Sequence, residues 1–94
     1  MAVVYILYSS SLDRYYIGST LDLDIRLNQH LANDFPGSYT GKAKDWEVFL
    51  CFENLDYQQA RKIEFHIKAM KSRRYIENLK QFPEMVARLV AKFS

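Results

Sequence analysis

Stretches of β-branched and aromatic residues predict three β-strands in the first part of the chain. Such residues fill positions 2–8 and, after a polar turn at 9–13, positions 14–18. Two runs of this kind joined by a short polar turn favour a β-hairpin. A third run, 46–52, alternates in a way typical of a strand. Its larger apolar residues occupy every second position and are expected on one covered face: Trp46, Val48, Leu50 and Phe52.

A different spacing predicts a helix between the second and third strands. Leucines recur every fourth residue, at positions 23, 27 and 31. This spacing places them on one side of a helix over about 23–33. Asp22 is a suitable N-cap, because its carboxylate can accept a backbone hydrogen bond from the first turn. The next segment, 34–45, contains one proline and two glycines and is expected to be a loop.

Three more helices are predicted in the second half, over about 57–71, 73–81 and 84–93. Each follows or begins with a residue suited to a helix start, namely Asp56, Ser72 and Pro83. Gln59 stands where a capping box places its second partner. The expected order is therefore β-β-α-β-α-α-α. This order is typical of a small α+β domain with a mixed or antiparallel sheet.

Length and composition predict one small domain spanning residues 1–94. No segment approaches the roughly 20 apolar residues of a membrane span. The amino terminus lacks the pattern of a signal peptide. The single cysteine, Cys51, excludes an internal disulfide and is expected to be a buried or half-buried strand residue. We therefore expect a reduced, cytoplasmic protein.

The charge is unevenly distributed although the net charge is only +2. Residues 61–80 hold seven basic and two acidic side chains. Such a basic stripe either faces phosphate groups or forms a solvated helix surface, and the charge alone leaves both open. If it faces nucleic acid, the candidate contacts are Lys68, Lys71, Arg73 and Arg74.

Glu64 is the unusual carboxylate of the predicted 57–71 helix. On a helical wheel it lies at the margin of the apolar side rather than opposite to it. One interpretation is an ion pair with Lys68, four residues later, on a solvated flank. The other is a ligand for a hard divalent cation such as Mg²⁺, which one carboxylate can hold together with waters and substrate phosphate.

Four further residues carry chemistry that would suit a phosphate substrate. Arg26 and His30 are four residues apart and share a helix face. An arginine can bind phosphate and stabilise charge that builds up in a transition state. Tyr5 and Tyr16 lie on the first two strands, where a structural role is the commoner one. A tyrosine acts as a base only if a nearby cation or guanidinium stabilises its phenolate.

Taken together in order, these motifs resemble the GIY-YIG nuclease family in its small, stand-alone, single-domain form. The first triplet corresponds to Val3-Val4-Tyr5 and the second to Tyr16-Ile17-Gly18. The remaining matches follow in sequence: Ser19-Thr20, Arg26, His30, Ser38-Tyr39-Thr40, Glu53, Ala60, Glu64 and Ile67-Lys68. The resemblance covers about residues 2–80 and leaves the C-terminal helix at 83–93 outside it. Two segments depart from the family pattern: Val3-Val4 in the first triplet and Arg73-Arg74-Tyr75-Ile76 after the later helix.

The resemblance implies a three-stranded antiparallel sheet flanked by helices, and hydrolysis of DNA phosphodiester bonds with one divalent ion, Mg²⁺ or Mn²⁺. It implies that Glu64 binds the metal and that Arg26 neutralises the scissile phosphate. Tyr5 would deprotonate or position the attacking water, with His30 and Tyr16 assisting. Branched, nicked or damaged DNA, as in repair or recombination, is the expected substrate, and RNA stays open.

Two other functions are compatible with the same residues. One is a nucleic-acid-binding accessory domain that keeps the fold but turns over slowly or not at all. The other is a protein-interaction module whose basic helix meets an acidic partner. Metal-dependent turnover separates the enzyme from the accessory domain. A steep salt dependence of DNA binding separates both from the interaction module.

Overall fold

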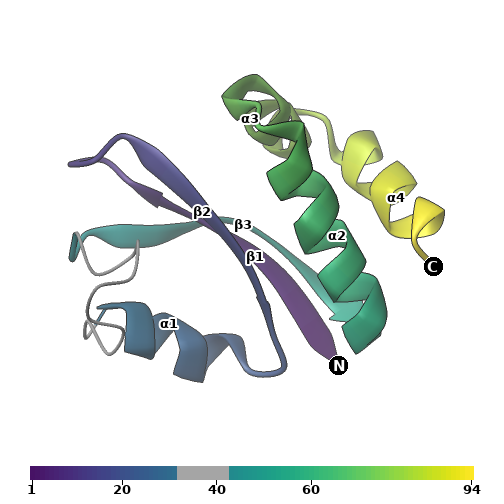
Figure 1. Ribbon diagram of the computed structural model, residues 1–94, viewed down its shortest axis with the longest axis horizontal. Helices are drawn as coiled ribbons and strands as arrows, with labels where there is room; N and C mark the ends of the chain where they lie inside the picture. The colour runs from purple at the N-terminus through teal and green to yellow at the C-terminus, as the bar shows by residue number, and fades with distance from the viewer. Residues whose placement is uncertain (32–42) are drawn as a thin grey trace.

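The computed structural model describes residues 1–31 and 43–94, without the side chains at 27 and 29–31. Its centre is an antiparallel sheet in the order β2-β1-β3 (Figure 1). The strands are β1 (Ala2–Ser9), β2 (Arg14–Thr20) and β3 (Trp46–Leu55). The expected three-stranded α+β architecture is confirmed, and its antiparallel form is the one that the resemblance implied. Strands β2 and β3 are longer than the sequence predicted.

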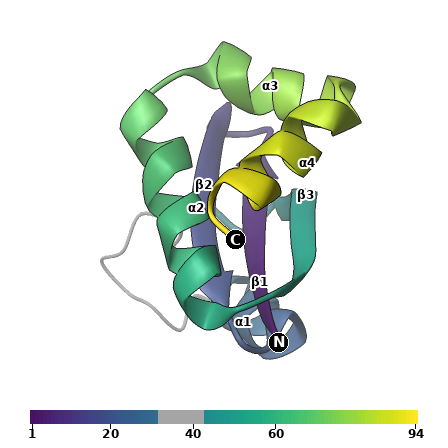
Figure 2. The same ribbon diagram turned by 90° about the vertical axis from the view of Figure 1, so that its right-hand side faces the viewer.

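The helices also follow the predicted order. They are α1 (Leu23–Leu31), α2 (Tyr57–Met70), α3 (Arg73–Gln81) and α4 (Pro83–Lys92). Helix α2 packs against β1 and β2, and α3 and α4 follow it over the same face of the sheet (Figure 2). No helix in the described part of the chain is long and apolar enough to cross a membrane.

The two faces of the sheet carry separate apolar clusters. The larger lies under α2, α3 and α4 and includes Val4 and Ile6 of β1. The smaller lies on the other face, where Tyr5 and Leu7 of β1 pack with Trp46. Alternation along β1 therefore supplies both clusters, because successive strand side chains point to opposite faces. The fold thus holds Tyr5 on the face away from the main core.

The prediction that Trp46, Leu50 and Phe52 share one face of β3 is wrong. Ile6 pairs with Leu50, but the next residue of β1 pairs with Val48, so one residue of β3 is unpaired between them. Such a bulge shifts the alternation by one position and moves side chains to the opposite face. Trp46 accordingly joins the smaller cluster, whereas Leu50 and Phe52 pack with the larger one.

Local hydrogen bonds explain where the helices begin and end. The Asp22 carboxylate accepts a hydrogen bond from the Ile25 backbone at 3.1 Å, as expected of an N-cap. The Ser72 hydroxyl accepts one from the Tyr75 backbone, also at 3.1 Å. Between α2 and α3, Lys71 adopts a left-handed conformation with φ 48°, which ends α2 and turns the chain into α3.

Asp45 connects the β1–β2 turn to the start of β3. Its carboxylate accepts hydrogen bonds from the Ser9 hydroxyl at 2.6 Å and from the Ser11 backbone at 2.8 Å. It also accepts from the hydroxyls of Ser10 and Ser11, at 3.1 and 3.0 Å. The Ser9 hydroxyl and the Ser11 backbone hold the pKa of the Asp45 carboxyl well below its usual range. The ionised form is therefore the one that stabilises this end of the sheet.

We predict that Asp45→Asn lowers the urea midpoint of unfolding at pH 7. Because the folded state lowers the pKa of Asp45, its contribution is present above the ordinary carboxyl pKa of 3.8 and is lost as the pH falls further. The gap in midpoint between the wild type and the variant should therefore shrink below that pH. Glu47→Gln, a change at an exposed β3 residue, is the control. Equal midpoints for wild type and Asp45→Asn at pH 7 would contradict the prediction.

Candidate active site

The site is built around Gly18, a position of the edge strand β2 that has no side chain. Tyr5 of the central strand pairs with Gly18 of β2. A Cβ atom placed on Gly18 would lie 2.5 Å from the Tyr5 hydroxyl and 2.6 Å from Cζ, closer than such atoms approach. The end of the Tyr5 ring therefore occupies the space that a side chain at position 18 would fill. A glycine here allows the Tyr5 hydroxyl to lie over the edge strand.

Glu64 of α2 meets this strand from the opposite face of the sheet. Its Oε1 accepts a hydrogen bond of 2.5 Å from the Ser19 hydroxyl, and its Oε2 pairs with Lys68 Nζ at 2.7 Å. The Glu64 side chain is only 17% exposed, so the carboxylate does not lie on a solvated flank. The expected pair with Lys68 does form. The structure thus combines parts of both interpretations: Glu64 is paired, yet it faces the site.

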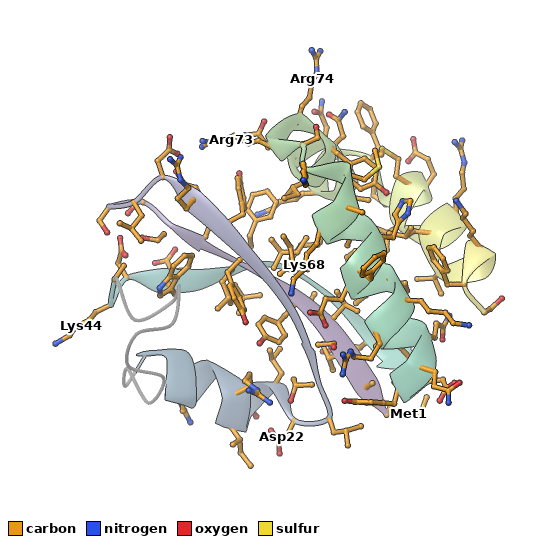
Figure 3. The ribbon with its side chains drawn as sticks, in the orientation of Figure 1. Met1, Asp22, Lys44, Lys68, Arg73 and Arg74 are labelled. Atoms are coloured by element: carbon orange, nitrogen blue, oxygen red, sulfur yellow. The ribbon has the colours of Figure 1, made fainter. Side chains whose placement is uncertain are left out.

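Lys68 connects the two sides of the strand. Its ammonium lies 5.9 Å from the centre of the Tyr16 ring, and this ring lies 6.3 Å from that of Tyr5. In Figure 3, Lys68 points from α2 toward the sheet. Tyr5, Tyr16, Glu64 and Lys68 therefore gather at one edge of the sheet, although they come from three separate elements.

Arg26 approaches the same edge from α1. It is half-buried and lines a cavity of about 340 Å³. The cavity is formed by the end of β2, the start of α1 and one residue of α2: Ser19, Thr20, Leu21, Asp22, Ile25, Arg26 and Tyr57. A cavity with an arginine and a serine hydroxyl in its wall is suited to an anionic group.

Burial dominates the acidity of Tyr5. The side chain is 2% exposed, and burial, together with Tyr16, raises the pKa of the phenol well above its ordinary value of 10.0. The Arg26 charge lowers the pKa of Tyr5 and the Glu64 charge raises it, both by less than burial does. At neutral pH the Tyr5 hydroxyl is therefore protonated.

Two of the sequence matches to the family fall wholly or partly outside the described residues. The backbone of His30 belongs to α1, but its side chain is not described. The segment Ser38-Tyr39-Thr40 lies within 32–42 and is not described either. The assisting role of His30 stays a prediction from the resemblance.

The oxygen groups around Glu64 fit a divalent cation that keeps most of its waters. No group of three or more His, Cys, Asp or Glu side chains gathers within residues 1–31 and 43–94 where side chains are described. A full protein cage is therefore not formed by these residues. The Glu64 carboxylate and the Ser19 hydroxyl are hard oxygen donors next to the Arg26 cavity. Mg²⁺ suits such a place, because it is commonly held by one or two carboxylates together with water and phosphate.

The basic residues expected at a nucleic-acid interface differ in their contacts. Arg73 Nη1 donates to Asp13 Oδ2 at 3.0 Å, and its Nη2 also pairs with the same carboxylate. These bonds lower the pKa of Asp13 to about 2. Figure 3 shows Arg73 directed toward the β1–β2 turn, whereas Arg74 points away from the molecule. Arg73 thus contacts the hairpin, and Arg74 and Lys71 are exposed.

Comparison with known protein families identifies the family of this chain. The family model described as the GIY-YIG catalytic domain matches residues 1–77 of the 94-residue chain. The chain belongs to the GIY-YIG family. Nucleases of this family hydrolyse phosphodiester bonds and generally depend on a divalent metal ion. No curated protein and no solved structure gives a significant match.

The two GIY-YIG triplets lie on the paired strands β1 and β2. The first triplet, Val3-Val4-Tyr5, ends at the tyrosine of β1, and the second, Tyr16-Ile17-Gly18, ends at its partner on β2. Sequence reasoning used Gly18 and Ser19 as markers of the family but did not place them in the site. The signal was available, because a short hairpin turn fixes the register that brings Tyr5 opposite Gly18.

We predict that Gly18→Ala destabilises the protein by about 1–3 kcal/mol, as overpacking does elsewhere, since the new methyl group collides with Tyr5. The measurement is the free energy of unfolding in urea. Tyr5→Ala provides the matched background: there, the same Gly18→Ala change should cost much less, because the ring that it meets is absent. Equal costs in both backgrounds would contradict the close contact between the two residues.

Proposed function

We propose that this GIY-YIG domain is a metal-dependent endonuclease that hydrolyses DNA phosphodiester bonds, with branched, nicked or damaged DNA as its substrates in repair or recombination. The observation that carries the proposal is the convergence of Glu64, Tyr5 and Arg26 at the edge strand β2. Arg26 lines the cavity at this strand, Ser19 in the wall of the cavity is hydrogen-bonded to Glu64, and the charges of Arg26 and Glu64 both act on the Tyr5 hydroxyl. A carboxylate, a hydroxyl and a guanidinium are groups suited to the hydrolysis of an anionic ester.

The roles follow from the position of each group. Arg26, in the wall of the cavity, would bind the scissile phosphate and offset the extra negative charge of the transition state. Glu64 would hold a divalent ion, Mg²⁺ or Mn²⁺, with the Ser19 hydroxyl beside it. When bound, such an ion supplies positive charge that activates water and stabilises the leaving oxygen.

Tyr5 is better suited to position the attacking water than to deprotonate it in the free protein. Burial raises the pKa of its phenol, and a protonated hydroxyl donates a hydrogen bond or accepts one from water. Arg26 opposes this shift, so added positive charge near the hydroxyl would make the phenolate more accessible. Tyr16 would orient the neighbouring Tyr5 ring, and His30 on α1 would assist proton transfer.

Lys68 would take part in this chemistry in two ways, first as the partner of Glu64 and then as a contact to DNA. In the structure its ammonium neutralises Glu64, and it therefore competes with a cation for Oε2. A bound ion and a DNA phosphate together would release Lys68 to contact the phosphate backbone. Lys71 and Arg74, both exposed, extend this contact toward α3, and Arg73 would join it only by leaving Asp13.

We predict that Glu64→Gln abolishes metal-dependent cleavage while leaving the fold and DNA binding largely intact, because the amide cannot supply the negative charge that a cation needs. Purified protein would be assayed on supercoiled, single-stranded, nicked and branched DNA with Mg²⁺ or Mn²⁺, and with EDTA. Glu84→Gln, an exposed glutamate of α4, is the matched control and should cleave as the wild type does.

Each other outcome of this assay has a clear meaning. Normal cleavage by Glu64→Gln would contradict the assignment of the metal to Glu64. Absence of cleavage by the wild type on every substrate, with salt-sensitive DNA binding retained, would favour the accessory DNA-binding domain. Loss of both cleavage and DNA binding in the Glu84→Gln control would show that such losses reflect misfolding rather than a change at the site.

We predict that Arg26→Ala lowers the cleavage rate by about 10²–10³-fold, the effect seen when one donor to a transition-state charge is removed. Single-turnover rates at saturating protein separate this loss from weaker binding. Arg26→Lys keeps the charge without the planar pair of donors and should recover only part of the rate. A rate for Arg26→Ala close to that of the wild type would place Arg26 outside the reaction.

A further inference from the structure

A second cavity lies between α2 and the C-terminal end of α4, and nothing in the proposed chemistry uses it. Its volume is about 500 Å³, larger than the 340 Å³ of the cavity at the site. We call it the Phe65 groove, after its most exposed aromatic side chain. It is lined by Arg61, Lys62, Phe65, His66, Ala69 and Phe93.

The Phe65 groove joins an exposed aromatic ring to positive charge. Phe65 is 75% exposed, which is unusual for a phenylalanine in a helix of a small domain. Arg61 and Lys62 are both exposed beside it, and none of the six lining residues is acidic. At its floor, the His66 ring packs against Phe93 with ring centres 5.4 Å apart. The His66 and Phe93 side of the groove is thus packed. The Phe65 ring, in contrast, is exposed and can contact a ligand.

A row of residues on α2 connects this groove to the site. Tyr57, Arg61 and Phe65 follow one another at intervals of four and therefore lie along one side of the helix. Tyr57 lines the Arg26 cavity, and its hydroxyl accepts a hydrogen bond from Arg61 at 3.2 Å. Phe65 lies eight residues after Tyr57, a separation of about 12 Å along the helix. At about 3.4 Å per nucleotide or more, one DNA strand covers this distance in a few nucleotides.

We propose that the Phe65 groove binds an unpaired nucleotide of the substrate strand, a few nucleotides from the scissile phosphate. The base would stack on the Phe65 ring, and its phosphates would meet Arg61 and Lys62. Phe65 has no polar side-chain atom with which to bind a phosphate. Its ring can instead contact a flat apolar surface such as the face of a base. Bases in a duplex are stacked on one another, and only an unpaired or extruded base can present its face to this ring.

This inference rests on the proposed nuclease function and narrows its substrate to DNA with unpaired nucleotides near the cut. Affinity for a labelled single-stranded oligonucleotide and for a duplex of the same sequence would be measured by fluorescence anisotropy at one salt concentration. EDTA in every sample prevents cleavage, so the result does not depend on turnover.

We predict that Phe65→Ala weakens single-strand binding by roughly 5- to 100-fold, the range for loss of one base–aromatic stack, and leaves duplex binding unchanged. Phe65→Tyr keeps the ring and should bind as the wild type does. Phe65→Leu keeps an apolar side chain without the ring and should behave like Phe65→Ala. Urea midpoints should be equal for all variants, because the side chain is mostly exposed.

Three results would overturn the inference. One is no change for Phe65→Ala, and another is equal loss for single-stranded and duplex DNA. The third is a wild type that dimerises in sedimentation while Phe65→Ala is monomeric, which would assign the groove to a second copy of the chain. Selective loss with Phe65→Ala from a wild type that cleaves nothing would support the groove and refute the nuclease proposal, so the two fail separately.

Discussion

The close contact between Tyr5 and Gly18 is the constraint on which the site depends. Tyr5 belongs to the central strand, and without the gap at Gly18 its ring could not extend over β2 to the edge of the sheet. The main core lies on the opposite face, so the tyrosine is fixed by the smaller cluster around Trp46. A buried ring held in this way offers its hydroxyl in one place, which reduces the reorganisation that a reaction would require.

Charge balance around Glu64 is the second requirement. A carboxylate that is mostly buried is unfavourable unless it is paired or hydrogen-bonded. Ser19 and Lys68 satisfy its two oxygens. Lys68 is about half exposed, so its ammonium can also turn toward solvent or toward a phosphate. The pairing that stabilises the carboxylate is therefore one that a cation at Glu64 could replace.

The sequence predicted the order of the seven elements in residues 1–31 and 43–94, because strand composition, leucine spacing and capping residues act locally. It did not predict the face on which Trp46 lies, since a single bulge in β3 reverses the alternation. The helical wheel placed Glu64 at a margin, but only the tertiary structure shows that Ser19 of another element meets it. The periodicity of apolar residues cannot predict contacts between residues that are far apart along the chain. Pairs such as Tyr5 and Gly18 are an exception, because the register of a hairpin brings them together.

The same distinction applies to the basic stripe of residues 61–80. A count of charges treats the basic residues of this segment as equivalent, yet in the structure they have different partners. Arg73 holds Asp13 of the hairpin, and the Lys80 ammonium lies 4.5 Å from the centre of the Phe49 ring. A phosphate that binds such a cation must replace the existing contact, and this holds also for Arg61, which donates to the Tyr57 hydroxyl. The proposed DNA surface is therefore better described by the residues that line the Arg26 cavity and the Phe65 groove than by the net charge of the segment.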